Sequence, residues 1–451
     1  MKNKITLLVV LQLFLMLGAC SSDSGSDSVP TPEPVVVKTP KITSFSKNSG
    51  EIGETITLSG ENLSDKISEI KITFDEVNAT IISATTKEIT FILPNSEKVL
   101  PKFALTIADK KVINEVKNDY KGAIGILPKP STSDWFTMEN TSLINDLGIH
   151  RIQQLSESKL YYSIDTNTSE GTSIYRTLDG GITWILWAHN TLRGGFYVTA
   201  NDEGWADRSF AFSKISKEGY LGFDEFAKFE DNQKVSVFKA TYVDDEMKNG
   251  TCVTYKGKVY TTNDGINFRK AYEVNITESD VFSLSLSTQI DNDHMWVIGS
   301  KRMKGRNDNL LDDRPFILFK NNTTDGWKEY PFIDEVNRCL AKEIYFVDKT
   351  NGFLLIDKYN DNTKIETKLF KTANGGDSWE QIYNQQFFTK FTFKDANTGW
   401  AIAENKIYKT VDGAATWTLD YTHDQPIKAI SYKNNVVWAI STDKIIKRYL
   451  K

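Results

Sequence analysis

Residues 175–184 read Tyr-Arg-Thr-Leu-Asp-Gly-Gly-Ile-Thr-Trp, and this pattern returns at residues 260–268, 370–379 and 408–417. Each copy carries an aromatic residue and a Thr, then an Asp or Asn, a small residue, and a closing Trp or Phe. Asp and Asn side chains accept hydrogen bonds from backbone N–H groups in tight turns, and Gly adopts positive φ without steric cost. The repeated stretch therefore predicts a self-capped turn between two β-strands, with the closing aromatic returning to a core.

The spacing of the copies indicates a repeating supersecondary unit. Successive copies follow one another at roughly one or two times the period of about 40–45 residues that a four-stranded blade needs. Asn322 to Trp327 reads as a degenerate copy inside the longest gap. The positions that we assign to the turn are Thr177, Asp179, Gly181 and Trp184; Asn263, Gly265 and Phe268; Thr372, Asn374, Gly376 and Trp379; and Thr410, Asp412 and Trp417.

A second repeat predicts buried inner strands. It consists of an aromatic residue at the start of a short aliphatic run, which is typical of a strand that is buried on both faces. The aromatic residues are Trp205, Trp296, Phe353, Trp400 and Trp438.

The four turn copies resemble the Asp-box, or BNR repeat, of sialidases, sortilin-type receptors and photosystem-assembly-factor-like propellers. This resemblance implies that residues 121–451 form a single β-propeller. At about 45 residues a blade, about seven blades are expected, with six to eight open. Because a ring must hide its edge strands, we expect residues 122–127 or 135–136 to complete the last blade.

Residues 40–120 carry short alternating apolar runs separated by Gly, Asn and Asp, which predict an immunoglobulin-like β-sandwich. The stretch Gly53-Glu-Thr-Ile-Thr-Leu-Ser-Gly60-Glu-Asn62 and the strand end Leu93-Pro94 resemble the IPT/TIG family of Ig-like modules. The resemblance implies a spacer or, alternatively, a ligand-binding module. The predicted fold class is therefore all-β, a sandwich followed by one propeller.

The first 39 residues predict export and a lipid anchor. Residues 1–19 combine Lys2 and Lys4 with an apolar run too short to span a bilayer, as a signal peptide does. Leu17-Gly-Ala-Cys20 resembles the lipobox of bacterial lipoproteins, which implies lipidation of Cys20. Residues 20–39, rich in Ser, Asp and Pro, predict a flexible tether. Its acidic start resembles the surface-export signals of Bacteroidetes lipoproteins, a plain spacer being the alternative, so we expect an outer-membrane protein, lipid-anchored and facing the exterior.

The composition argues against several partners. With 54 Lys and Arg against 59 Asp and Glu, the net charge is −5, which offers no broad basic surface for nucleic acid. The four His are far apart without metal-ligand spacing, and no Gly-rich phosphate loop occurs. We therefore expect no metal and no cofactor. Cys252 and Cys339 fall in different blades, either as buried thiols or as a disulfide.

Aromatic residues without a place in either repeat are the ligand-binding candidates, because aromatic faces stack on sugar rings. Core packing is the alternative for each of them. The candidates are Trp135, Trp187, Trp327, Tyr161, Tyr162 and Tyr197.

The sequence assigns no catalytic residue. Sialidase-like enzymes need an arginine triad and a Phe/Tyr-Arg-Ile-Pro segment, and residues 150–153 lack both the aromatic and the Pro. Other glycosidases need only two facing carboxylates. Acidic clusters that offer such carboxylates, with solvated loops as the alternative, are Asp244, Asp245 and Glu246; Asp291 and Asp293; and Asp312 and Asp313.

We therefore expect a cell-surface lipoprotein that binds a glycan, or another extracellular ligand, through its propeller during polysaccharide capture or uptake. The expected partners are an extracellular polysaccharide or oligosaccharide and an outer-membrane transporter complex. A glycoside hydrolase on the same propeller, sialidase-like or other, is one alternative. A protein-binding assembly scaffold is the second.

Overall fold

The computed structural model describes residues 38–130, 134–139, 148–165, 172–191, 196–208, 211–220, 227–230, 237–242, 244, 246–254, 257–274, 281–304, 311–322, 324–332, 338–360 and 362–450. The predicted signal peptide, Cys20 and the tether up to residue 37 lie outside these residues. The chain divides into two units, Met1–Thr39 and Pro40–Lys451. In the described part of the chain, no helix has the length and apolar character needed to cross a membrane.

Two β-sheets form the N-terminal sandwich. The first holds β10 (Ile113–Asn114), β1 (Lys41–Phe45), β3 (Thr55–Glu61), β7 (Glu88–Ile92) and β6 (Thr80–Ala84), and the second holds β5 (Val77–Asn78), β4 (Ile70–Phe74), β8 (Phe103–Ile107) and β9 (Lys110–Lys111), each in that order. A 3-10 turn, η1 (Ile67–Glu69), precedes β4.

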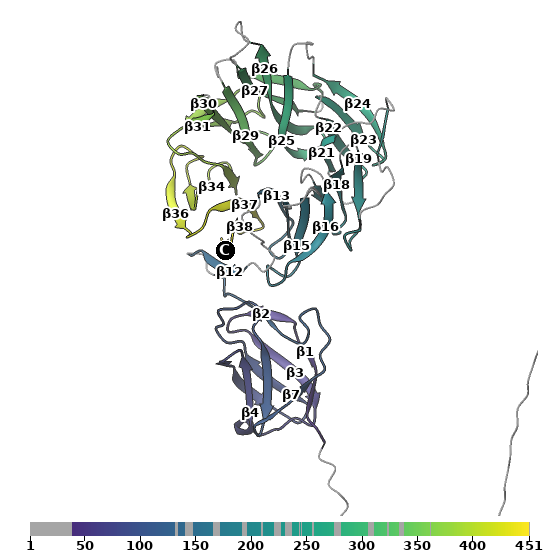
Figure 1. The fold of residues 1–451 in the computed structure, drawn as a ribbon, viewed down its shortest axis with the longest axis vertical. Helices are drawn as coiled ribbons and strands as arrows, with labels where there is room; N and C mark the ends of the chain where they lie inside the picture. The colour runs from purple at the N-terminus through teal and green to yellow at the C-terminus, as the bar shows by residue number, and fades with distance from the viewer. Residues whose placement is uncertain are drawn as a thin grey trace, which may run out of the picture. The chain divides into compact units, whose positions relative to one another are not determined.

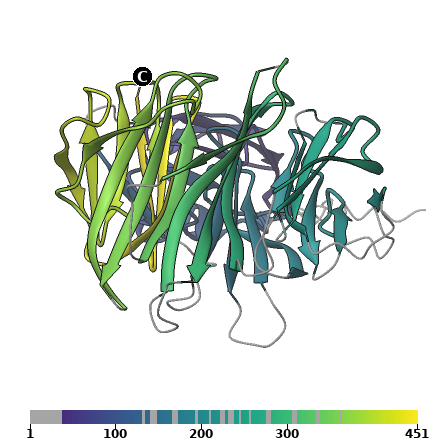
Figure 2. The ribbon, with the colours of Figure 1, turned by 90° about the horizontal axis from the view of Figure 1, so that it is seen from above.

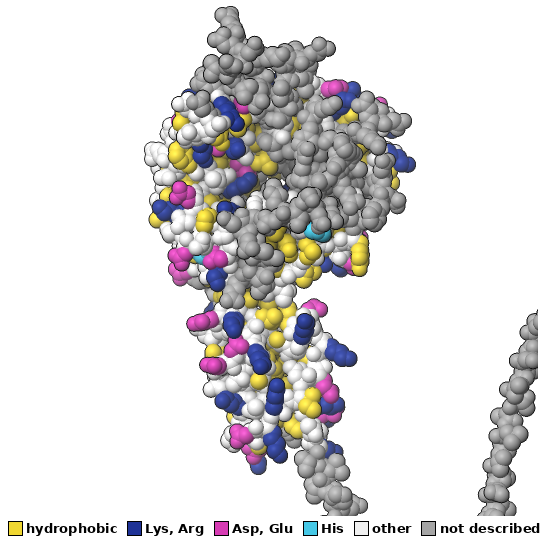
Figure 3. Space-filling view, in the orientation of Figure 1, with side chains coloured by type: hydrophobic (Ala, Val, Ile, Leu, Met, Phe, Trp, Pro, Cys, Tyr) yellow, Lys and Arg dark blue, Asp and Glu magenta, His cyan; other side chains and the backbone are white. Residues whose placement is uncertain are grey.

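The sandwich core follows from period-2 alternation along its strands. Ile56 and Leu58 of β3 and Ile72 and Phe74 of β4 are buried, and they meet Phe91 of β7 in one cluster. Lys side chains are interspersed with Asp and Glu over the sandwich face seen in Figure 3. One face of each sheet is therefore packed and the other is solvated.

The chain after the last sandwich strand folds back onto the sandwich. β11 (Gly125–Leu127) pairs in parallel with β2 (Ser49–Glu51). Ile124 and Ile126 are buried in the sandwich core. Residues 121–127, which the sequence pattern placed with the propeller, thus pack with the first domain.

From residue 136 on, the described residues form seven sheets of three to five strands. The first four are β13 (Ile149–Gln154), β14 (Leu160–Asp165), β15 (Thr172–Thr177) and β16 (Ile185–Thr191); β17 (Phe196–Val198), β18 (Gly204–Arg208) and β19 (Ala211–Ile215); β20 (Lys228–Phe229), β24 (Asn267–Glu273), β23 (Lys258–Thr262), β22 (Gly250–Thr254) and β21 (Val237–Tyr242); and β25 (Val281–Asp291), β26 (His294–Lys304), β27 (Leu311–Asn321) and β28 (Lys328–Pro331). The other three are β29 (Arg338–Phe346), β30 (Gly352–Asn360), β31 (Thr363–Thr372) and β32 (Glu380–Tyr383); β33 (Lys390–Phe393), β34 (Gly399–Ala403), β35 (Lys406–Thr410) and β36 (Thr418–Thr422); and β12 (Phe136–Glu139), β39 (Lys444–Tyr449), β38 (Val436–Ser441) and β37 (Ile427–Lys433).

These sheets surround a central axis (Figures 1 and 2). The innermost strands β13, β17, β21, β25, β29, β33 and β37 each contact the next one, and β37 contacts β13 again. Within each sheet the strands are antiparallel neighbours in chain order, apart from the added strands β12 and β20. The architecture is that of a closed β-propeller.

The ring closes by pairing the two ends of the propeller sequence. β12 runs antiparallel to β39, with Phe136 opposite Lys447 and Glu139 opposite Lys444. Met138 of β12 is buried against Trp438 and other residues of the same cluster. The prediction of closure by N-terminal residues is therefore confirmed for the segment that starts at Phe136, whereas residues 125–127 pair with the sandwich.

The aromatic residues of the second repeat lie on the second strands of their sheets. Their side chains are fully buried, because a second strand has neighbours on both edges and packed sheets on both faces. The strands concerned are β18, β26, β30, β34 and β38, with Trp205, Trp296, Phe353, Trp400 and Trp438.

Candidate functional site

The repeated turns join the third strand of a sheet to the fourth. In the first copy, Thr177 Oγ1 donates to Asp179 Oδ1 at 2.8 Å and accepts from Gly181 N at 2.8 Å. Asp179 also accepts from the Thr183 backbone N–H at 3.0 Å and from the Thr183 hydroxyl at 2.6 Å. Gly181 has a φ of 98°, in the region that only Gly adopts without strain. The residue pattern thus builds a rigid turn.

The third and fourth copies repeat this geometry. Thr372 Oγ1 donates to Asn374 Oδ1 at 2.9 Å, and Gly376 N donates back to Thr372 at 3.0 Å. Thr410 Oγ1 donates to Asp412 Oδ1 at 2.8 Å. The closing residues Trp379 and Trp417 pack, partly buried, against core clusters.

The second copy corrects one predicted position. Asp264, rather than Asn263, accepts the turn hydrogen bonds, from Asn267 N at 2.8 Å and from the Asn267 amide at 2.7 Å. This turn is one residue shorter, because Gly265 N already reaches Thr262 Oγ1 at 3.0 Å. The side chain and backbone N–H of Asn267 lower the pKa of Asp264. Phe268 is buried and closes the turn as predicted.

Three of the six candidate aromatic residues lie deep in the propeller. Tyr161, Tyr162 and Trp187 are at most 3% exposed. The Tyr161 hydroxyl donates to Asp202 at 2.9 Å, and its ring meets Trp187 edge-on at 5.0 Å between centroids. The ring centroids of Tyr162 and Trp184 lie 5.1 Å apart. These burials leave no ring face for a sugar from solvent at these positions.

The other three candidates are partly buried and lie in different places. Trp135 donates its indole N–H to Asp420 at 2.9 Å and packs beside β39. Tyr197 packs against the cluster that contains Trp205. Trp327 packs, partly buried, against a further cluster. The structure therefore does not bring the six aromatic residues together into one surface.

One sequence signal accounts for Tyr161. It lies opposite Arg176 on β15, as Trp400 lies opposite Lys409 on β35. Arg176 and Lys409 each stand one residue before the Thr that starts a repeated turn. Tyr161 therefore occupies the same position relative to its turn as Trp400 does, and it belongs to the inner-strand aromatic repeat. The prediction from sequence did not assign it to that repeat.

The acidic clusters considered for hydrolysis serve mainly as turn caps and ion pairs. Burial alone would raise the pKa of Asp244, but hydrogen bonds from the backbone N–H groups of Lys248 and Asn249 outweigh burial and lower it. Burial alone would also raise the pKa of Asp291, but hydrogen bonds from Lys349 and His294 outweigh burial and lower this pKa to about 2. A general acid needs a raised pKa, so neither carboxylate has that character.

The remaining acidic residues of these clusters differ in their surroundings. Glu246 pairs with Lys248, and Asp293 pairs with Lys320 at 2.5 Å. Asp245 and the Asp312 side chain lie outside the described residues. Asp313 is 4% exposed at the start of β27.

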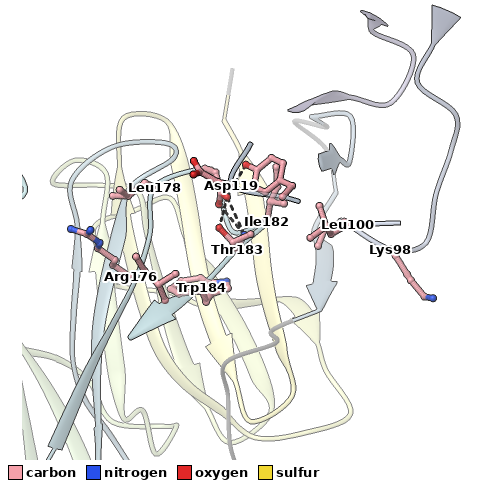
Figure 4. Close-up of a pocket in the computed structure, with 12 residues that line it drawn as sticks. Lys98, Leu100, Asp119, Arg176, Leu178, Ile182, Thr183 and Trp184 are labelled. Carbon is pink, nitrogen blue, oxygen red and sulfur yellow. Dashed lines mark hydrogen bonds between the residues drawn. The ribbon is translucent and has the colours of Figure 1, made fainter. Parts of the chain in front are cut away.

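A cavity of about 850 Å³ lies where the sandwich meets the first propeller sheet (Figure 4). Residues 98–100 and 119–120 line it from the sandwich side, and residues 176, 178–179 and 182–185 line it from the first repeated turn and its flanks. It is a concave space of the size that small-molecule ligands occupy. None of the six candidate aromatic residues lines it.

Hydrogen bonds fix the back of the cavity. The Tyr120 hydroxyl donates to Asp179 at 2.9 Å, so the sandwich is tied to the turn carboxylate that Thr183 already holds. Burial, followed by the charge of Asp179, raises the pKa of Tyr120. Trp184 forms part of the wall and is supported from behind by Tyr162. The wall is therefore pre-formed.

The mouth of the cavity combines apolar and polar side chains. Leu100, Leu178 and Ile185 are 37%, 38% and 47% exposed. Asp119 adds a carboxylate to the lining, whereas the Lys98 ammonium lies 3.4 Å from Asp75 and extends away from Leu178 (Figure 4). Such a lining suits a ligand with an apolar face and several hydroxyl groups.

Arg176 contributes less to this cavity than its position suggests. Its guanidinium Nη1 donates to the Lys217 carbonyl oxygen at 2.7 Å and lies over the Trp187 ring at 5.8 Å. Figure 4 shows its side chain extending away from Lys98 and Leu100. Only the part of Arg176 near the backbone is therefore placed to meet a ligand.

The topology defines an all-β protein made of an immunoglobulin-like sandwich and a propeller. The family model of the IPT/TIG domain matches residues 40–119, so the sandwich is an IPT/TIG domain. A search of curated proteins found no match.

Three solved structures illustrate what the chain is similar to. YCF48 bound to D1 peptide has a TM-score of 0.49 and 12% identity over 71% of this chain and 97% of that one. The WD40 β-propeller domain of Doa1 has a TM-score of 0.42 and 10% identity over 69% and 97%. An auxiliary nutrient binding protein from Bacteroides thetaiotaomicron VPI-5482 has a TM-score of 0.33 and 11% identity over 92% and 99%. The fold assignment rests on the sheet topology.

Proposed function

We propose that this protein is a lipoprotein of the outer cell surface that captures an oligosaccharide in the cavity between its IPT/TIG domain and its propeller. The propeller has seven blades of the Asp-box class, one for each sheet. The lipid is attached to Cys20, and residues 20–39 hold the two domains away from the membrane. The captured glycan is then delivered to an outer-membrane transporter complex.

The observation that carries this proposal is the lining of the cavity. Sugar rings are amphipathic: their C–H faces pack on apolar side chains and their hydroxyl groups hydrogen-bond to charged and polar ones. Leu178 and Ile185 offer the apolar surface, and Asp119 offers a carboxylate in the same lining. Because Tyr120 and Asp179 already fix the wall, a ligand meets a surface that needs little reordering.

Affinity electrophoresis of the full chain in gels that contain a panel of neutral polysaccharides tests the proposal. We expect retardation by at least one polysaccharide and a loss of about tenfold or more in affinity for Leu178→Glu, which puts a charge into the apolar mouth. Val411→Glu is the matched control, because Val411 holds the same place in the fourth repeated turn and is 66% exposed. Equal affinity of the two variants contradicts the proposed site.

Two other outcomes favour the alternatives. Release of reducing ends from the retained polysaccharide identifies a glycoside hydrolase. Absence of any retardation, together with a stable protein partner in pull-downs, identifies an assembly scaffold.

The anchor is tested separately. Cys20→Ser removes the thiol that would carry the lipid, so the variant is expected in the soluble fraction while the wild type stays with the outer membrane. Protease added to intact cells should degrade the wild-type protein if it faces the exterior.

A further inference from the structure

We propose a second ligand site on the propeller, formed by Arg338, Tyr359, Lys364 and Phe387, that binds a carboxylate-bearing saccharide such as a uronic acid chain. It goes beyond the proposed function, since it uses different residues, a different blade and a charged rather than a neutral sugar.

The first observation is a cross-strand row. Arg338 on β29 lies opposite Tyr359 on β30, and Tyr359 lies opposite Lys364 on β31. Directly opposed residues of neighbouring strands point to the same side of a sheet. The row therefore presents a cation, an aromatic ring and a second cation side by side, with about 10 Å between the outer two backbones.

The second observation is that buried carboxylates lie beneath the two cations. Asp313 and Asp357 are each 4% exposed. Arg338 Nε lies 3.9 Å from Asp313, and Lys364 Nζ lies 3.6 Å from Asp357. The buried carboxylates hold the cations in place, while the cations, about a third and a quarter exposed, form the outer layer.

The polar groups of the site are also fixed from within. The Asp357 carboxylate accepts from Thr367 Oγ1 at 2.6 Å and from the Tyr359 hydroxyl at 3.4 Å. Arg338 Nη1 donates to Asn362 Oδ1 at 2.6 Å, and its guanidinium lies 5.5 Å from the centre of the Tyr359 ring. The side chains are therefore pre-positioned before any ligand arrives.

The third observation is an exposed aromatic ring at the same place. Phe387, in the connection from β32 to β33, is 51% exposed, and Lys364 Nζ lies 5.3 Å from its ring centre. A half-exposed Phe beside a cation offers a sugar ring an apolar face next to a partner for its carboxylate. Neutral sugars use only the first of these contacts, so the row selects carboxylated ones.

The site is separate from the cavity described above. Lys364 is the second residue of β31, and the repeated turn follows Thr372 at the other end of that strand. At about 3.3 Å for each residue, the two ends are about 25 Å apart. A ligand bound at the row therefore lies at the end of the blade that is remote from its repeated turn.

Affinity electrophoresis of the full chain in polygalacturonate gels tests the site, with carboxyl-reduced polymer as the neutral probe. We expect retardation by polygalacturonate only, weakened about tenfold or more by Phe387→Ala and by Lys364→Gln, and weakened by added salt. Both side chains are partly or largely exposed, so the variants should fold, which an unchanged Tm verifies. Lys406→Gln, at the start of the third strand of the next blade, is the matched control.

The outcomes separate this proposal from the proposed function. Leu178→Glu should leave binding of polygalacturonate unchanged while it weakens binding of neutral glycan about tenfold or more. Equal losses for Lys406→Gln and Lys364→Gln mean that net charge alone holds the polymer and overturn the site, as does wild-type affinity of Phe387→Ala.

Discussion

The first and the fourth repeated turns share their internal hydrogen bonds and differ in what surrounds them. Asp179 and Asp412 hold the same partners within the turn, but Asp179 also accepts the Tyr120 hydroxyl from the sandwich. Leu178 lines the cavity, whereas Val411 is largely exposed. The motif therefore makes a turn at both places, and the cavity that we propose as a binding site forms where the sandwich meets the first of them.

Replacing the Trp that closes each turn should give the largest difference in stability between the first and the fourth turn. Trp184→Ala is expected to lower the free energy of unfolding by about 3–5 kcal/mol, because Trp184 is buried against Tyr162 and Trp438. Trp417→Ala should cost less, since Trp417 is only partly buried against its cluster. Urea unfolding of both variants measures the difference, and equal costs contradict it.

A buried amine gives the first turn a pH dependence. Lys447 Nζ donates to the Gly180 carbonyl oxygen at 3.2 Å and lies 4.1 Å from the Trp438 ring centre. Burial lowers the pKa of Lys447 to about 7. Between that value and the ordinary lysine pKa, the unfolded chain binds more protons than the folded one, so stability should rise with pH by up to about 1.4 kcal/mol per unit.

Replacing Lys447 tests whether this amine causes the rise in stability with pH. In Lys447→Met the rise in stability between pH 7 and pH 9 should disappear, as measured by urea midpoints. Lys371, whose Nζ lies 3.5 Å from the Ala396 carbonyl oxygen beside the fourth turn, provides the matched control as Lys371→Met. An unchanged slope in Lys447→Met contradicts the assignment.

The backbone of the two turns offers a smaller test. Gly181→Ala should cost about 1–2 kcal/mol, since its φ of 98° disfavours any side chain and the new Cβ would lie 3.2 Å from Met138. In the fourth turn Ala414 already occupies this place, with a φ of 72°. For Ala414→Gly, relief of strain and loss of a buried methyl group should nearly cancel, within about 0.5 kcal/mol. Thermal melts of both variants compare the turns.

The last test concerns the contact that distinguishes the first turn. Tyr120→Phe removes the hydrogen bond to Asp179 and should lower stability by about 1 kcal/mol. Asp412 has no counterpart of this bond among the described contacts, so Asp412→Asn should leave the sandwich unaffected. Hydrogen exchange at residues 119–127 should increase in the first variant and stay unchanged in the second.

Much of the fold could be predicted because each repeat encodes local geometry. The Thr and Asp of the turn bond within seven residues, and the inner-strand aromatics stand in apolar runs that only a buried strand tolerates. Asn263 was misassigned because Asn and Asp are adjacent there and only the shorter loop of the folded turn selects Asp264.

The cavity and the row of Arg338, Tyr359 and Lys364 were harder to predict from the sequence. The cavity joins residues 98–100 to residues 178–185, and nothing local marks that contact. The row of Arg338, Tyr359 and Lys364 depends on strand register, which period and composition do not reveal. Aromatic residues left over from the repeats proved to be mainly packing residues, because large rings fill the space between blades.

The pairing of β12 with β39 has a consequence for the order of events during biosynthesis. The sandwich strands, up to β11, lie within about 90 residues of one another and can find their partners early. β12 cannot pair until residues 444–449 have been made, so the last blade forms only after the rest of the propeller has been synthesised. Until then Met138 and Trp438 lack their shared core. Removal of residues 444–449 would separate β12 from β38 and open the ring, rather than remove only one strand.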